Sequence, residues 1–145
     1  MTKEQLKDYC LAEFENIEKV LSELNQVIKP GKIEYANFEL AAICAYVHNF
    51  YNGIENLIKR VAAFQKVSIK ETPTWHKDLL NSAMEIGLID PDLHEVLSDY
   101  LSFRHYFVHS YCFSIEWEKL KPLVEKLENT CQAVRGSIFS YIERI

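Results

Sequence analysis

The strongest constraint on the fold of this chain is the segment from about Tyr35 to Gln65, which is apolar on most sides of a helix. Its apolar residues include Phe38, Leu40, Ile43, Val47, Phe50, Tyr51, Ile54, Leu57, Ile58, Val61 and Phe64. A helix with so little polar surface needs neighbours on several sides, so we expect this one to be central. Gly53 lies inside it and costs about 1 kcal/mol relative to alanine in an exposed helix. We therefore expect Gly53 to mark the close approach of another helix.

Helical periodicity also describes most of the remaining chain. Apolar residues recur in steps of three and four over four further segments, at about 2–28, 75–86, 91–109 and 116–145. Thr2 and Thr74 are the expected N-caps of two of these helices, Gly87 is the expected end of the second, and Pro122 is expected to kink the last. The pattern predicts an all-α protein, an up-and-down bundle of four long helices plus one short helix.

Composition supports a helical protein and limits the function classes. The chain of 145 residues has only 4 Gly and 4 Pro, which disfavours an all-β protein rich in tight turns, and its length predicts a single domain over residues 1–145. Its net charge of -5 argues against a generic nucleic-acid binder, although a local basic cleft remains compatible with it. The densest basic group, Lys59-Arg60 with Lys66 and Lys70, is expected either to flank an RNA cleft or to be ordinary surface.

The cysteines and the apolar runs indicate the compartment. Cys10, Cys44, Cys112 and Cys131 form no C-x-x-C or zinc pattern, and three of them are expected in the core, at positions 10, 44 and 131. The first residues lack the apolar stretch of a signal peptide, and no run approaches the roughly 20 apolar residues that span a bilayer. We expect a cytoplasmic protein without a membrane partner.

Chemically active residues gather at the end of the fourth predicted helix. The stretch 101–111 reads Leu-Ser-Phe-Arg-His-Tyr-Phe-Val-His-Ser-Tyr and contains the pattern Arg-x4-His-x-Tyr, formed by Arg104, His109 and Tyr111. Arginine carries a permanent charge and a fork of donors that suits phosphate oxygens, and histidine exchanges protons near neutral pH. A phosphate-binding group beside a proton-transfer group is the minimum needed to cleave an RNA backbone without a metal ion.

The two residues of this pair do not share a face of an ideal helix. Arg104 and His109 are five positions apart, about 140° around the helix axis. Either the helix loosens near His109 and the two side chains converge, or a second copy of the chain completes the site. His105 and His109 share a face and could ligate a metal at i, i+4. Since no third ligand accompanies them in sequence, no metal site and no cofactor are expected.

The Arg-x4-His spacing resembles the motif of the HEPN superfamily, and the added Tyr111 resembles its HepT branch, RNase toxins paired with minimal nucleotidyltransferase antitoxins. Two other segments are similar to HepT proteins, Phe50-Tyr51-Asn52-Gly53-Ile54-Glu55-Asn56 and Trp75-His76-x-x-Leu79-Leu80. The resemblance covers nearly the whole chain, but only Arg-x4-His-x-Tyr is specific. It implies a homodimer in which both motifs line one cleft.

The resemblance also implies residue roles and partners. Arg104 would hold the scissile phosphate, His109 would act as general acid or base, and His105 would help to position the substrate. The implied substrate is RNA, with tRNA as one candidate. The implied partner is a cognate nucleotidyltransferase that adenylylates Tyr111, as in a type VII-like toxin–antitoxin pair. Without the resemblance, Tyr111 is expected to pack its ring where the helix ends.

Two alternatives to this function remain open at the level of sequence. One is a non-catalytic HEPN module that binds a nucleotide or docks a nucleotidyltransferase, and the other is a plain helical interaction domain. The remaining histidines, His48, His76 and His94, are expected to be hydrogen-bonded or solvent-facing. Whether Asn52 and Glu55 of the second helix contribute to the site is left open.

Overall fold

The computed structural model describes residues 1–145, except for the side chain of Cys112. Every regular element of the described residues is a helix, which confirms the all-α prediction. The elements are α1 (Lys3–Val27), α2 (Asn37–Phe64), α3 (Trp75–Glu85), α4 (Pro91–His109), the short 3-10 helix η1 (Cys112–Ser114), α5 (Trp117–Glu125) and α6 (Leu127–Arg144). None of these helices has both the length and the apolar character needed to cross a membrane.

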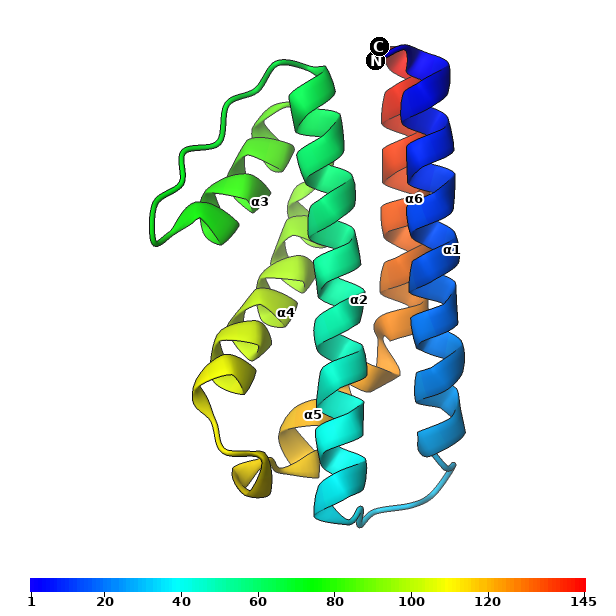
Figure 1. Ribbon diagram of the computed structural model, residues 1–145, viewed down its shortest axis with the longest axis vertical. Coiled ribbons are helices and arrows are strands. Elements are labelled where there is room, and N and C mark those ends of the chain that lie inside the picture. The colour runs from blue at the N-terminus through cyan, green and yellow to red at the C-terminus, as the bar shows by residue number, and fades with distance from the viewer.

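Helix α2 is central, as its apolar sequence predicts. It packs against α1 on one side and against α3 and α4 on another, while η1 and α5 contact it as well. Figure 1 shows α2 between the α1–α6 pair and the α3–α4 pair, with both chain termini at one end of the molecule. The core contains Cys10, Cys44 and Cys131, so the expected burial of these three cysteines is confirmed.

Gly53 marks the closest approach of α1 to α2, as expected. A Cβ atom at this position would lie 2.6 Å from Cγ1 and 2.9 Å from Cδ1 of Ile17 on α1. Real Cβ atoms do not approach other carbons so closely, so a side chain here would push the two helices apart. The missing side chain is therefore what allows the two longest helices to touch at this level.

The capping predictions are half correct. Thr2 caps α1 with a full capping box, since its hydroxyl accepts from the backbone N–H of Gln5 and the Gln5 side chain accepts from the Thr2 N–H. Thr74 makes no such cap on α3. Its ψ of 17° lies outside the extended region that an N-cap requires, and its hydroxyl donates to Asp78 instead, at 3.2 Å. Gly87 ends the α3 region with a φ of +80°, as expected.

The last predicted helix is two helices, and the expected kink at Pro122 is wrong. Pro122 lies inside α5, and the chain changes direction at Lys126, between α5 and α6. The buried hydroxyl of Tyr100 on α4 donates to the Leu123 carbonyl at 2.6 Å, the group that would accept from Leu127 in a continuous helix. Lys126 is held at the break by an ion pair with Asp99, at 2.8 Å. The break is thus fixed by contacts with α4.

Candidate functional site

Helix α4 carries the motif, and its first turn fixes where the helix starts. The Asp90 side chain accepts from the backbone N–H of Leu93 at 2.7 Å, and Pro91 occupies the first turn, where its missing N–H costs nothing. The helix then continues without interruption to His109, and Ser110 follows in an extended conformation. The motif therefore occupies the last turns of a regular α-helix, and the helix does not loosen to bring Arg104 and His109 together.

Arg104 is half-buried, and its Nε atom is buried without a hydrogen-bond partner in the part of the chain that the structure describes. Among the same residues, no carboxylate lies within ion-pair distance of its guanidinium. Its positive charge acts instead on His48 and Tyr51 of α2. A buried donor next to an uncompensated cation is costly, because each lacks the partner that water would supply.

His105 and His109 lie on the outer surface of α4. Both side chains are exposed, and their ring centroids are 4.5 Å apart, as expected for residues four positions apart. Arg104 thus has its Nε atom buried on the inner side of the helix, while His109 faces solvent. Among the described residues, no group of three or more His, Cys, Asp or Glu side chains lies close enough together to hold a metal ion.

Tyr111 follows the end of α4 and is strongly exposed. Its relative exposure is 74%, and its ring stacks on Phe113 with the centroids 5.3 Å apart and the planes 8° apart. All the other tyrosines are buried or half-buried, so Tyr111 is the exposed phenol of the described chain. The expected packing of Tyr111 at the helix end is limited to this stack on another exposed ring.

A polar group on α2 faces Arg104, and only part of it is predictable from sequence. His48, Tyr51 and Glu55 recur at steps of three and four and so lie on one face of the helix. The Glu55 carboxylate is 3% exposed and pairs with Nδ1 of His76 on α3, at 2.7 Å. Tyr51 is 1% exposed and looks in sequence like one more core aromatic. The spacing of His48 and Glu55 indicates a polar face of α2, but nothing in the sequence marks Tyr51 as a member of it.

The surroundings of this group shift two pKa values. Burial, followed by the nearby Arg104 charge, lowers the pKa of His48 from its ordinary value of 6.5. Burial, followed by the charge of Glu55, raises the pKa of Tyr51 strongly, with Arg104 opposing the shift. His48 is therefore neutral at pH 7, and Tyr51 keeps its proton.

The three histidines outside the motif, His48, His76 and His94, differ in whether their rings are hydrogen-bonded. His76 is paired with Glu55, and Nε2 of His94 lies 2.8 Å from the side-chain oxygen of Asn81, so the expectation of hydrogen-bonded rings is confirmed for these two. His48 differs, because its Nδ1 atom is buried without a partner among the described residues. Its ring packs against Phe107 of α4, with centroids 5.4 Å apart.

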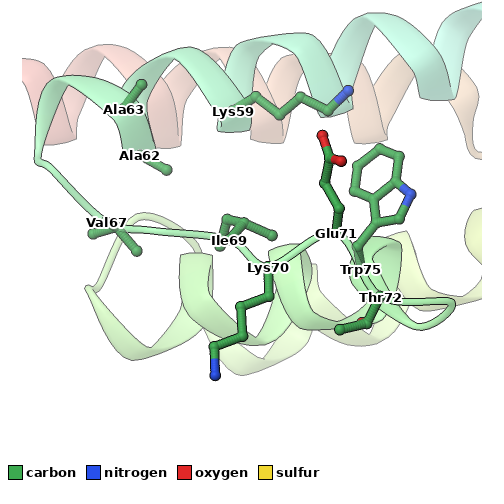
Figure 2. A pocket seen from close by; sticks show the side chains of 9 residues that line it. All are labelled: Lys59, Ala62, Ala63, Val67, Ile69, Lys70, Glu71, Thr72 and Trp75. Carbon is green, nitrogen blue, oxygen red and sulfur yellow. The ribbon is translucent and has the colours of Figure 1, made fainter.

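The side chains of the predicted basic group have different neighbours in the structure. Lys59 and Lys70 line a pocket of about 540 Å³ between the C-terminal part of α2 and the segment that leads into α3. Figure 2 shows Lys70 pointing away from this pocket, and the Lys59 Nζ lies 4.5 Å from the centroid of the Trp75 ring. Arg60 packs on Tyr9 of α1, at 4.3 Å. The pocket lies about three helical turns along α2 from Tyr51, so it is separate from the Arg104 site.

Comparison with known proteins identifies the family. The family model described as "HepT-like protein" matches residues 42–145, which include all of α3 to α6 and most of α2. Neither the curated proteins nor the solved structures yielded a match. The matched region contains Arg104, His109 and Tyr111 together with the polar face of α2. The match covers more than half of the chain, and the chain belongs to the HepT-like family.

Proposed function

We propose that this chain is a toxin endoribonuclease that cleaves RNA without a metal ion, with tRNA as one candidate target. Family membership supports a HEPN toxin-type function. The observation that carries the proposal is Arg104, a half-buried guanidinium with no ion-pair partner among the described residues. The Nε–H of Arg104 is buried without a partner, and a buried donor without a partner costs stability. A phosphodiester would supply the missing negative charge.

The proposed reaction is a transesterification within the RNA chain. The ribose 2′-oxygen attacks the phosphorus, the bond from phosphorus to the 5′-oxygen of the next nucleotide breaks, and a 2′,3′-cyclic phosphate is left. His109 takes the 2′-hydroxyl proton while water gives a proton to the leaving 5′-oxygen, or His109 gives that proton while water takes the first, and its exposed position allows both. Arg104 stabilises the charge that develops on the phosphorane oxygens. His105, whose ring lies 4.5 Å from that of His109, positions the substrate.

The proposed active form is a homodimer in which the outer surfaces of two α4 helices meet. Two observations support this arrangement. Arg104 and His109 occupy different sides of a regular helix, so one chain alone does not combine them easily. The same region exposes apolar side chains, with Val108 at 55% and Phe113 at 67%. Such exposed apolar surface beside a polar site is typical of an interaction surface.

The proposed control is adenylylation of Tyr111 by a cognate nucleotidyltransferase. The phenolic oxygen would attack the α-phosphorus of ATP, pyrophosphate would leave, and the phenolic proton would pass to solvent. The attached phosphate would lie two residues beyond His109 and would compete for the cleft by charge and by volume. The exposed position of the Tyr111 ring supports this role.

The test is incubation of the purified chain with total RNA in EDTA. Cleavage should survive EDTA and should be lost in Arg104→Ala and in His109→Ala. His94→Gln is the matched control, because His94 lies on the same helix and is bonded to Asn81. Failure of the well-folded wild-type chain to cleave any RNA would favour the non-catalytic nucleotide-binding or docking module.

A further inference from the structure

Three side-chain polar atoms in the described residues are buried without any hydrogen-bond partner, and they belong to one cluster. They are Nδ1 of His48, the hydroxyl of Tyr51 and Nε of Arg104. The Arg104 charge acts on both of the other residues, so the cluster joins α2 to α4. Buried polar atoms in folded proteins nearly always have partners, and their absence calls for an explanation.

The cluster is not a packing error that the fold could simply relax. Tyr51 is 1% exposed, and Phe50 and Ile54 next to it are core residues. The His48 ring is held against Phe107, at 5.4 Å between centroids. Behind the cluster, the Glu55 carboxylate is committed to His76, at 2.7 Å. Packing thus holds the three atoms in place.

The chemistry of the three groups indicates what would satisfy them. Arg104 Nε–H and the Tyr51 hydroxyl are donors, and a neutral histidine can present an N–H as well. Three donors next to one positive charge suit an oxyanion with several lone pairs. A water molecule could bridge two of them, but it would leave the Arg104 charge without a counterion.

We propose that His48 and Tyr51 of α2 form with Arg104 a built site for a phosphate oxyanion, and that the phosphodiester of RNA occupies it. The nature of the occupant rests on the proposed nuclease function, while the anion site itself does not. In this arrangement Tyr51 and His48 touch the phosphate directly. Arg104 then binds it through the inner side of α4.

Tyr51→Phe is the decisive variant, because it removes only the hydroxyl and keeps the ring. The probe is inorganic phosphate, titrated while the Nε–H signal of Arg104 is followed by NMR. Phosphate should shift this signal saturably in the wild type, and Tyr51→Phe should weaken binding on the order of ten-fold or more. The same variant should also melt at an equal or higher temperature, since a buried hydroxyl without a partner has been removed.

Tyr100→Phe is the matched control. Its hydroxyl is buried like that of Tyr51 but is bonded to the Leu123 carbonyl, at 2.6 Å. This variant should melt at a lower temperature and bind phosphate as the wild type does. His48→Phe, which keeps the aromatic contact with Phe107, is the second test variant and should weaken phosphate binding as Tyr51→Phe does.

Two results would overturn the site. They are unchanged phosphate affinity in folded Tyr51→Phe, and a lower melting temperature of that variant, which would mean a structural role. Competition with phosphate by AMP but not by a 2′-deoxy dinucleotide would keep the anion site and overturn the phosphodiester as its occupant. RNA cleavage measured in parallel separates the two proposals. Phosphate binding without cleavage would refute only the nuclease function, and cleavage without phosphate binding at this cluster would refute only the anion site.

Discussion

At the scale of single residues, the notable property of Arg104 is the mismatch between its burial and its partners. Its Nε atom is buried, and the neighbouring groups His48 and Tyr51 are themselves unpartnered within the described chain. Functional sites often hold such strained or unsatisfied groups at a cost in stability. Burial and then the Arg104 charge also lower the pKa of His48, and this shift has a measurable effect on stability.

Acidification should destabilise the fold through His48. Its pKa is lowered by burial and then by Arg104, so between the folded pKa and 6.5 the unfolded chain binds a proton that the folded chain does not. The free energy of unfolding should therefore fall as the pH falls through this window. Denaturant unfolding at several pH values should show a shallower dependence for His48→Phe than for His94→Gln. Equal slopes for the two variants would remove His48 as the cause.

Tyr111→Phe should escape the proposed adenylylation and keep the proposed nuclease activity. The phenol is the exposed one of the described chain, and the proposed proton transfer does not use it. After incubation with the partner and ATP, the intact mass of the wild type should rise by adenylyl units, and the variant should lack the first of them. Tyr106→Phe is the control, since its hydroxyl donates to the Ser114 carbonyl at 3.2 Å. An inhibited complex with unmodified Tyr111 would mean steric masking.

At the scale of helices, the contact of α1 with α2 depends on one missing side chain. Gly53 permits the approach of Ile17, and Gly136 on α6 has nothing within 4 Å of its would-be Cβ. Replacement of glycine by alanine should therefore have opposite effects on the free energy of unfolding at these two positions.

Gly53→Ala should lower the free energy of unfolding by about 1–2 kcal/mol, because the overpacking cost exceeds the gain in helix propensity. Gly136→Ala should raise it by up to about 1 kcal/mol, because only the propensity gain applies. Denaturant unfolding of both variants measures the difference. A stabilised Gly53→Ala protein would show that α1 can move away from α2 without loss.

Sequence predicts helices better than it predicts their ends. The central position of α2 follows from its apolar surface, and the Thr2 cap follows from local chemistry. The break at Lys126 does not, since it depends on the Tyr100 hydroxyl of another helix. In the site, the Arg-x4-His-x-Tyr pattern is visible in sequence, and the roles assigned to its members stay predictions. Tyr51 is hidden because a buried tyrosine with an unpartnered hydroxyl is written with the same letter as a core tyrosine.

At the scale of the whole molecule, the proposed site divides between the inside and the outside of α4. Arg104 faces α2, while His105 and His109 face solvent beside Val108 and Phe113. The single-domain organisation over residues 1–145 and the pairing of two copies stay predictions, and the second can be tested in two independent ways.

Light scattering should give about twice the chain mass of 17.0 kDa at micromolar concentration. Val108→Asp should shift the mass toward that of one chain, because it places a charge in the exposed apolar surface that we propose is buried between copies. Leu11→Asp, an exposed leucine on α1, is the control and should leave the mass unchanged. Full activity at the mass of one chain would refute the shared cleft.

Mixing two inactive variants should restore cleavage if the cleft is shared. A dimer of Arg104→Ala with His109→Ala contains one intact arginine and one intact histidine on opposite chains. Such a mixture should regain a fraction of wild-type activity after the chains are allowed to exchange. Double-variant homodimers, with both substitutions in each chain, should remain inactive. Absence of any recovery in a confirmed mixed dimer would place the reacting pair within one chain.

The proximity of the two chain ends has a practical consequence for engineering. The Lys3 side chain donates to the Ile145 carbonyl at 2.6 Å, and Figure 1 shows both ends at the opposite end of the molecule from the last turn of α4. A short linker could therefore join residue 145 to residue 1, and the ring could be reopened in the loop at 66–73. Such a circular permutant would carry α3 to α6 in its first part and α1 and α2 in its last, so a cut at the new linker would divide it into two separately expressed halves, one with α4 and one with α2, that must associate before the proposed site forms.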